Sequence, residues 1–380
     1  MTAIADTDRL ARAALTCVAE PGDAAMGALL RVCEPAAIIT ALTEGRAPGG
    51  AGRVPGLDRA LRRWTARLGE APSAVTLDRW RRDGIRLLCP GDPGWPGQLD
   101  VLGDSRPWGL WLRGSADLRY ACLRSVSMVG TRAATSYGKH VGLELAAALA
   151  QRGWTVVSGG AFGIDECAHR GALMAEGITI AVLASGVDEP YPLGHHLLFE
   201  AIAAHGVLVS EWPPGRRPTR PGFLVRNRVI TALSRGTVVV EAALRSGALN
   251  TARHARDQLR PLMAVPGPVT SPASAGCHEI IRECGAVCVT GARDVLEHLA
   301  FPGEELPAAG ERGPVLPRDE LDPVSRRVLE AVPARAGRGP ARIAVSAGVD
   351  FDTVLRCLGG LAAAGFVERC DRGWRIRKKT

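Results

Sequence analysis

The sequence contains almost no lysine. Lys139, Lys378 and Lys379 are its only lysines, so the other 44 of its 47 basic residues are arginine. The net charge of +8 and the isoelectric point of about 9.2 favour an anionic partner, with nucleic acid first and a membrane surface second. Because a GC-rich genome also encodes arginine in place of lysine, the charge alone does not decide for nucleic acid.

Targeting and membrane-spanning segments are also missing. The first 15 residues include Asp6, Asp8 and Arg9 and lack the apolar core of a signal peptide. No run approaches the roughly 18 uncharged apolar residues of a membrane helix, since even Val141–Ala150 is interrupted by Glu144. We therefore expect a soluble, cytoplasmic protein with no membrane partner.

Metal-binding and catalytic patterns are absent as well. None of the ten cysteines forms a C-x-x-C pair, and most lie in apolar surroundings typical of small buried residues. There is no G-x-S-x-G, no H-E-x-x-H, no Walker lysine loop and no close acidic pair. The sequence therefore predicts no metal site and no enzyme.

The chain is long enough for two or three domains, and its pattern changes along its length. Residues 1–82 contain short Ala/Leu-rich helical segments, and residues 83–300 alternate β-branched runs with helical stretches, which indicates a parallel sheet. We predict a linker over 301–319 and a separate domain over 320–380. The predicted strands are Ser125–Val129, Trp154–Val157, Ile178–Leu183, Val207–Val209, Thr237–Val240, Pro261–Val265 and Val287–Val289.

The C-terminal segment has the pattern of a winged helix-turn-helix. Ser325–Val332, Ala341–Ala347 and Asp352–Ala363 are predicted helices, and Phe366–Ile376 is a predicted hairpin. The third helix begins at Asp350 and Asp352, whose carboxylates suit a helix N-terminus and repel phosphates. The pattern therefore fits the fold better than it fits reading of duplex DNA.

Two turns that follow predicted strands have the composition of phosphate-binding loops. The first contains Gly130, Thr131 and Arg132, and the second is the glycine turn over 158–165, with Gly159, Gly160, Phe162 and Gly163. Ligands of open α/β sheets bind at this edge, where helix N–H groups are free. The glycine turn matches a dinucleotide fingerprint only in part, because the following strand ends in residues 184–186, Ala-Ser-Gly, and not in an acid.

Two further segments suit an anion. Arg226, Asn227 and Arg228 are predicted to open a helix, where positive charge opposes the helix dipole unless an anion relieves it. Ser246 and Gly247 open another predicted helix, and an N-cap and a phosphate contact explain them equally well. Glu241 is interpreted as a cap or an arginine partner without a catalytic role.

These blocks, read in order, resemble the DprA/Smf family of bacterial DNA-processing proteins. The matching motifs are V-G-T-R (129–132), S-G-G-A-F-G-I-D (158–165), A-H-R-G-A-L (168–173), S-E-W-P-P-G (210–215), R-N-R-V-I-T-A-L-S (226–234) and V-V-E-A-A-x-R-S-G-A-L-N-T-A (239–252).

The resemblance implies an α/β fold with an extended Rossmann-like parallel sheet, an N-terminal helical SAM-like domain and a C-terminal winged-helix domain. It also implies a homodimer that binds single-stranded DNA and helps load the RecA recombinase, as in natural transformation (competence), with no cofactor. Its DNA-contacting residues would be those of the two turns and of the 226–228 block. Two positions depart from the family, which usually has Arg at Phe162 and Pro at Leu224.

Two other functions stay open on the sequence. One is a nucleotide-binding or nucleotide-hydrolysing Rossmann enzyme related to the lysine-decarboxylase-like proteins, although residues 241–251 lack the P-G-G-x-G-T-x-x-E motif of those enzymes. The other is a transcription regulator that works through the C-terminal domain, which the acidic start of its third helix disfavours.

Overall fold

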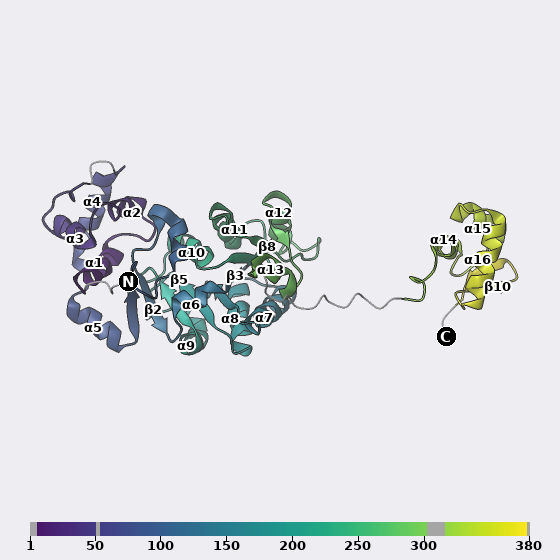
Figure 1. Ribbon diagram of the computed structural model, residues 1–380, viewed down its shortest axis with the longest axis horizontal. Coiled ribbons are helices and arrows are strands. Elements are labelled where there is room, and N and C mark those ends of the chain that lie inside the picture. Colours follow the sequence, from purple (N-terminus) through teal and green to yellow (C-terminus); the bar gives the residue numbers. More distant parts are fainter. Residues whose placement is uncertain (1–5, 51–53, 302–315, 378–380) are drawn as a thin grey trace. The chain divides into compact units, whose positions relative to one another are not determined.

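A computed structural model describes residues 6–50, 54–301 and 316–377 (Figure 1). The chain forms two compact units, Met1–Pro307 and Ala308–Thr380. The predicted linker lies largely outside the described residues. Within the described ranges, no helix is both long enough and apolar enough to cross a membrane.

A nine-stranded sheet forms the centre of the first unit, in the order β1-β2-β6-β5-β4-β3-β7-β8-β9. The seven predicted strands are confirmed and run parallel. Their bounds are β3 Ser125–Val129, β4 Thr155–Ser158, β5 Thr179–Leu183, β6 Val207–Ser210, β7 Gly236–Val239, β8 Leu262–Ala264 and β9 Val287–Cys288.

Two further strands, β1 (Ile85–Leu88) and β2 (Leu110–Gly114), were not predicted. β2 runs antiparallel to both β1 and β6 and extends the sheet at one end. The 21 residues between β1 and β2 hold no further strand, only turns and the 3₁₀ helix η2 (Gly97–Ser105). The two strands contain a single β-branched residue, Ile85, so they lack the signal that marks the predicted strands.

The strand order places a reversal at the centre of the sheet. From β3 the chain adds β4, β5 and β6 on one side and then returns to place β7 on the other side of β3. The loops that leave the carboxyl ends of β3 and β7 therefore diverge. Such a reversal is where open α/β sheets bind their ligands.

Helices cover both faces of this sheet. One face packs against α6 (Leu118–Leu123), α10 (Arg220–Ala232), α11 (Gly247–Asp257) and α12 (Ala275–Glu283). The other packs against α7 (Ser136–Ala150), α8 (Ile164–Met174) and α13 (Ala292–Leu299), and α9 (His196–His205) lies beside α8. Neighbouring strand residues such as Val156 and Val157 point into opposite cores, which is why these strands read as continuous apolar runs.

Four N-terminal helices share a core of their own and belong to the same unit as the sheet: α1 (Asp6–Val18), α2 (Ala24–Leu29), α3 (Pro35–Thr43) and α4 (Leu57–Thr65). The fifth, α5 (Ala74–Arg82), packs against the sheet beside β1. Arg9 on α1 forms a salt bridge of 2.8 Å with the buried Asp92 after β1, which ties the helices to the sheet.

The second unit contains three helices and a hairpin, as the sequence predicts. They are α14 (Pro323–Ala331), α15 (Pro340–Ala347), α16 (Phe351–Ala363), β10 (Val367–Cys370) and β11 (Gly373–Ile376). Asp350 caps α16 by accepting a 2.9 Å hydrogen bond from the Thr353 N–H. The acidic helix start is thus confirmed as a cap.

Candidate nucleic-acid interface

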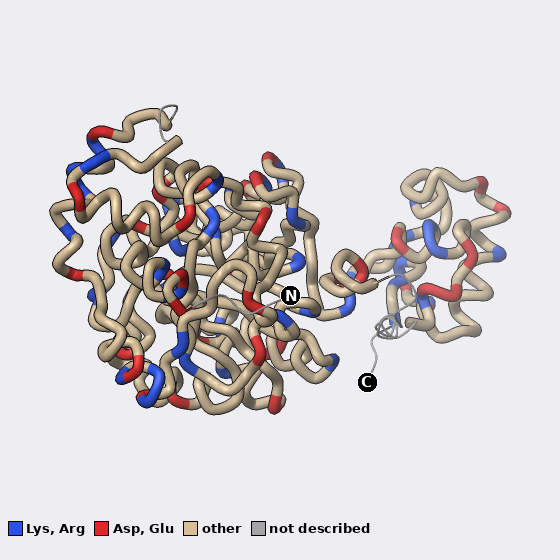
Figure 2. The backbone as a smooth tube through the Cα atoms, turned by 60° about the vertical axis from the view of Figure 1, so that its left-hand side comes forward, with Lys and Arg blue, Asp and Glu red and all other residues tan. Residues whose placement is uncertain are grey.

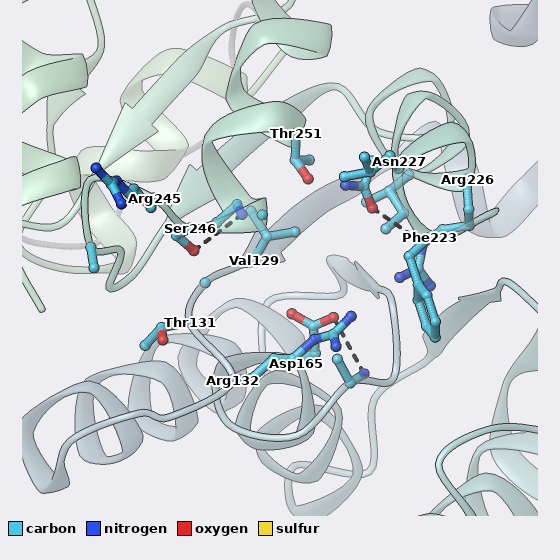
Figure 3. A pocket seen from close by; sticks show the side chains of 17 residues that line it. Val129, Thr131, Arg132, Asp165, Phe223, Arg226, Asn227, Arg245, Ser246 and Thr251 are labelled. Atoms are coloured by element: carbon cyan, nitrogen blue, oxygen red, sulfur yellow. Dashed lines mark hydrogen bonds between the residues drawn. The ribbon is translucent and has the colours of Figure 1, made fainter. Parts of the chain in front are cut away.

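A pocket of about 420 Å³ lies at the carboxyl ends of β3 and β7, where the strand order reverses (Figure 3). It is lined by the loop after β3, the glycine turn and the start of α8, one side of α10 and the loop that enters α11. The predicted site residues among its lining are Gly130, Thr131, Arg132, Arg226, Asn227, Ser246 and Gly247. The structure thus brings three of the four predicted segments together, and the glycine turn contributes Ala161 and Asp165 in place of its predicted residues.

Backbone hydrogen bonds fix the loops at the floor of the pocket. The Thr131 N–H donates to the Glu241 carbonyl at 2.7 Å, and the Ile164 N–H donates to the Thr131 carbonyl at 3.2 Å. A side chain at Gly130 would place Cβ 2.5 Å from Ile164 and 2.8 Å from the Glu241 carbonyl oxygen. Glycine is therefore required at 130 for the close approach of three loops.

Glu241 has a structural role at the start of α7. Its carboxylate accepts hydrogen bonds from the Thr135 N–H at 2.9 Å and the Thr135 hydroxyl at 2.7 Å, and Thr135 in turn caps α7. This agrees with the interpretation of Glu241 as a capping residue.

Arg132 and Phe223 form the open side of the pocket. The exposed Arg132 guanidinium lies 4.9 Å from the centre of the Phe223 ring, a cation–π distance. The Phe223 ring also meets the half-exposed Tyr191 ring edge-on at 5.9 Å. A guanidinium beside two accessible rings suits both groups of a nucleotide, because it attracts the phosphate while the rings stack on the base.

Arg226 does not lie at a helix start, so the prediction based on the helix dipole is wrong. Helix α10 begins at Arg220, with Thr219 as its N-cap, which places Arg226 in the middle of the helix. Its guanidinium is buried and donates to the carbonyls of Gly159, at 2.7 Å, and Val182. Burial lowers the pKa of Arg226 to about 10, against the opposing effect of Asp165.

The glycine turn is already occupied by a carboxylate of the protein. Oδ2 of the buried Asp165 accepts hydrogen bonds from the N–H groups of Gly159, at 3.1 Å, and Ala161, at 3.4 Å. The interpretation of this turn as a free phosphate cradle is therefore wrong for these two donors. Gly160 and Gly163 have φ values of +71° and +82°, which explains the choice of glycine by backbone geometry.

Arg228 lies away from the pocket. Its buried guanidinium forms two hydrogen bonds of 2.6 Å with the Glu211 carboxylate and two more with the Ser105 carbonyl. A fifth hydrogen bond goes to the Val225 carbonyl, so the donor capacity of the guanidinium is used. The side chain thereby joins α10 to Glu211 after β6 and to Ser105 in η2. The structure therefore gives Arg228 a structural role.

The start of α11 completes the pocket. Ser246 is the N-cap and accepts a 3.2 Å hydrogen bond from the Ala248 N–H, while a Cβ at Gly247 would meet only open space. The exposed Arg245 precedes the cap, and Asn227 on α10 donates to Asn250 on α11 at 3.1 Å. The N-cap alternative for Ser246 is thus correct, and the space at Gly247 stays accessible.

Phe162 is exposed but does not line the pocket. Its side chain is 48% exposed, and its ring meets the buried His195 ring edge-on at 4.5 Å. The alternative of a core position is therefore wrong. A contact with nucleic acid at Phe162 stays a prediction.

The Phe162→Ala variant is expected to lose clearly less than the about 3–5 kcal/mol that removal of a buried phenylalanine costs. The physical reason is that about half of the Phe162 side chain stays in contact with water in the folded protein. Thermal unfolding followed by circular dichroism measures this loss, and a change as large as that of a buried ring would show that the ring is enclosed.

Basic and acidic residues are interspersed along the chain of the first unit, so charge by itself does not mark the site (Figure 2). Exposed arginines without a salt bridge lie at and near the pocket, as they do elsewhere on the described part of this unit, for example at Arg152 and Arg253. Within residues 6–50, 54–301 and 316–377, no carboxylate oxygen lies within 4.0 Å of Arg132, Arg217, Arg220 or Arg245. The described residues also contain no cluster of three or more potential metal ligands.

Among the pocket residues that sequence reasoning missed are Asp165, Phe223 and Arg245. Phe223 precedes Arg226 and Asn227 by three and four positions, which is the spacing of one helix face. This spacing did not enter the prediction, because the predicted helix starts at Arg226 and so leaves Phe223 outside it.

Comparison with known proteins agrees with this architecture. The sequence model of the DNA recombination-mediator protein A family matches residues 86–300. A protein of Mycobacterium tuberculosis that carries the name DprA is 45% identical over 381 residues, which cover 98% of this chain and 95% of the relative.

Two solved structures are similar. DNA processing protein A of Streptococcus pneumoniae superposes with a TM-score of 0.64 at 27% identity, over 79% of this chain and 100% of that one. DNA processing protein A of Helicobacter pylori, a structure described for its single-stranded DNA binding mode, superposes with a TM-score of 0.51 at 30% identity, over 56% of this chain and 94% of that one. By the match of its sheet domain and its full-length relative, this chain belongs to the DNA recombination-mediator protein A (DprA/Smf) family.

Proposed function

We propose that this protein binds single-stranded DNA across the pocket at the carboxyl ends of β3 and β7 and performs no chemistry on it. The observation that carries the proposal is the pairing of Arg132 with the Phe223 ring at 4.9 Å on the open side of the pocket. The described single-stranded DNA binding of the Helicobacter pylori relative supports it.

The path of the strand follows from the unpaired arginines. Arg245 and Arg132 lie at the pocket, and Arg220 begins α10, one turn before Phe223. Phosphates would lie along these guanidinium groups, and bases would stack on the rings of Phe223 and Tyr191. The pocket edge consists of loops and helix starts and presents no helix shaped to enter a duplex groove, which favours single strands.

The acidic start of α16 disfavours reading of duplex DNA by the second unit. Asp350, Phe351 and Asp352 are exposed there, followed by Leu355 and Arg356. The two carboxylates repel phosphates, whereas Arg356 can donate to a base edge. We propose that this unit is a winged-helix domain and that the N-terminal helices form a SAM-like domain.

Family membership leads to the finer proposals. We propose that the protein acts in the cytoplasm as a homodimer and helps load the RecA recombinase on DNA that enters during natural transformation. A RecA strand-exchange assay on DNA coated with single-strand-binding protein measures the loading step. Stimulation is expected, and no effect on the rate would contradict this part.

Fluorescence anisotropy with labelled oligo-dT, a duplex of equal length and AMP tests the binding proposal. Oligo-dT is expected to bind more tightly than the duplex. Its log K should fall linearly with the logarithm of the salt concentration, with a slope of about −0.7 for each phosphate that the protein neutralises. AMP is expected not to compete. Tighter binding of the duplex, or a flat salt response, would contradict the proposal.

Deletion of residues 318–380 is expected to leave oligo-dT affinity largely unchanged, because the pocket belongs to the first unit alone. The measurement is the same titration on the truncated and full-length proteins. A collapse in affinity with native circular dichroism would assign DNA binding to the second unit.

A further inference from the structure

We propose that Asp165 occupies, with its own carboxylate, the place where the glycine turn would otherwise hold a phosphate, and thereby excludes mononucleotides from the pocket. Asp165 would then determine specificity for DNA over free nucleotides. The inference rests on the proposed function, since it names a ligand class that the same pocket rejects.

The turn has the geometry of a phosphate site. It joins the end of β4 to the start of α8, an 11-residue helix, and two of its N–H groups converge on one point. In Rossmann-type proteins such donors hold a phosphate oxygen. Here both donate to Oδ2 of Asp165, at 3.1 Å from Gly159 and 3.4 Å from Ala161.

The guanidinium of Arg226 lies beside the same turn. Arg226 donates to the Gly159 carbonyl at 2.7 Å, and a Cβ at Gly159 would lie 2.6 Å from its Nη2. Asp165 and Arg226 are 7% and 6% exposed, so both charges are withdrawn from water. Burial raises the pKa of Asp165 and lowers the pKa of Arg226, and the opposite charge of the other residue offsets part of each shift. The carboxylate therefore supplies the negative charge that a bound phosphate would otherwise supply.

Exclusion follows from electrostatics at low dielectric. Asp165 lines the pocket, as Figure 3 shows, so a phosphate that entered the turn would come close to a buried like charge. Such repulsion is far stronger in the interior than in water. The phosphates of a DNA strand avoid it because Arg132 and Arg245 attract them at the exposed rim. A mononucleotide has one phosphate, so it can use only one such contact at the rim and gains little affinity there.

Asp165→Asn and Asp165→Ala test the proposal, with AMP and inorganic pyrophosphate as probes. Both variants remove the negative charge near Arg226. Asp165→Ala also frees the two turn N–H groups, whereas the amide oxygen of Asp165→Asn can still accept from them. We expect AMP affinity to rise by about tenfold or more, as for one charge-assisted hydrogen bond. Inorganic phosphate should also raise the melting temperature of the variants more than that of the wild type, which loss of structure alone does not produce.

Asp188→Asn is the matched control. Asp188 also accepts a backbone N–H, from Gly215 at 2.7 Å, but lies outside the pocket lining. This variant should not gain affinity for AMP or pyrophosphate.

Three results would overturn the proposal. Wild-type protein that binds AMP or pyrophosphate as tightly as oligo-dT contradicts it directly, and this measurement needs no variant to fold. Folded Asp165 variants without a gain in anion affinity do so too, as does an equal gain in Asp188→Asn. Failure of wild-type protein to bind oligo-dT would instead refute the proposed function. The two failures can be distinguished, because the AMP and pyrophosphate titrations do not depend on DNA binding.

Discussion

Arg228→Ala is expected to lower the free energy of unfolding of the first unit by about 3–5 kcal/mol, because it leaves the Glu211 carboxylate buried without its partner. The two side chains are 7% and 8% exposed and share two hydrogen bonds of 2.6 Å. Urea denaturation followed by circular dichroism measures the loss. At temperatures where the variant is folded, its oligo-dT affinity should equal that of the wild type.

A double variant separates the charge from the packing. Arg228→Met with Glu211→Leu removes both charges, and replacement of a whole buried pair by apolar groups is often neutral or stabilising. The double variant should therefore recover most of the lost stability. Loss of oligo-dT binding by folded Arg228→Ala would return this residue to the DNA interface.

Arg132→Ala and Phe223→Ala are expected to weaken oligo-dT binding in different ways. Loss of the Arg132 hydrogen bond to a phosphate costs about 1.5–3 kcal/mol, which is roughly 10-fold to 150-fold in Kd. Loss of base stacking on Phe223 costs about 1–3 kcal/mol. Only Arg132→Ala should also reduce the salt slope, by about 0.7, because only it removes a charge.

Arg152→Ala is the control for these two variants. Arg152 is exposed and follows α7, next to the start of β4, so it lies at the edge of the sheet opposite the pocket. Its removal subtracts one positive charge without touching the proposed path. An effect on affinity as large as that of Arg132→Ala would show that binding follows net charge and not the pocket.

The central strands were predictable because they are buried on both faces. Runs such as residues 155–158 carry β-branched residues that point into two cores, so they stand out without alternation. The antiparallel strands β1 (I-R-L-L) and β2 (L-W-L-R-G) gave no comparable signal, because Ile85 is their only β-branched residue and each contains an arginine.

The site was predictable at the level of loops but not of side chains. Arg226 and Arg228 stand two positions apart in one tripeptide, yet on a helix they point about 200° apart. One therefore faces the pocket and the other faces Glu211. The role of Asp165 depends on Arg226, 61 residues away, and contacts at that separation leave no local pattern in a single sequence.

Photocrosslinking of a 4-thiothymidine oligonucleotide, mapped by mass spectrometry, tests the central claim most directly. The account predicts crosslinks in the peptides that contain Tyr191 and Phe223, with loss of the second crosslink in Phe223→Ala and competition by unlabelled oligo-dT. Crosslinks confined to residues 318–377, or to the edge of the sheet that carries Arg152, would contradict it.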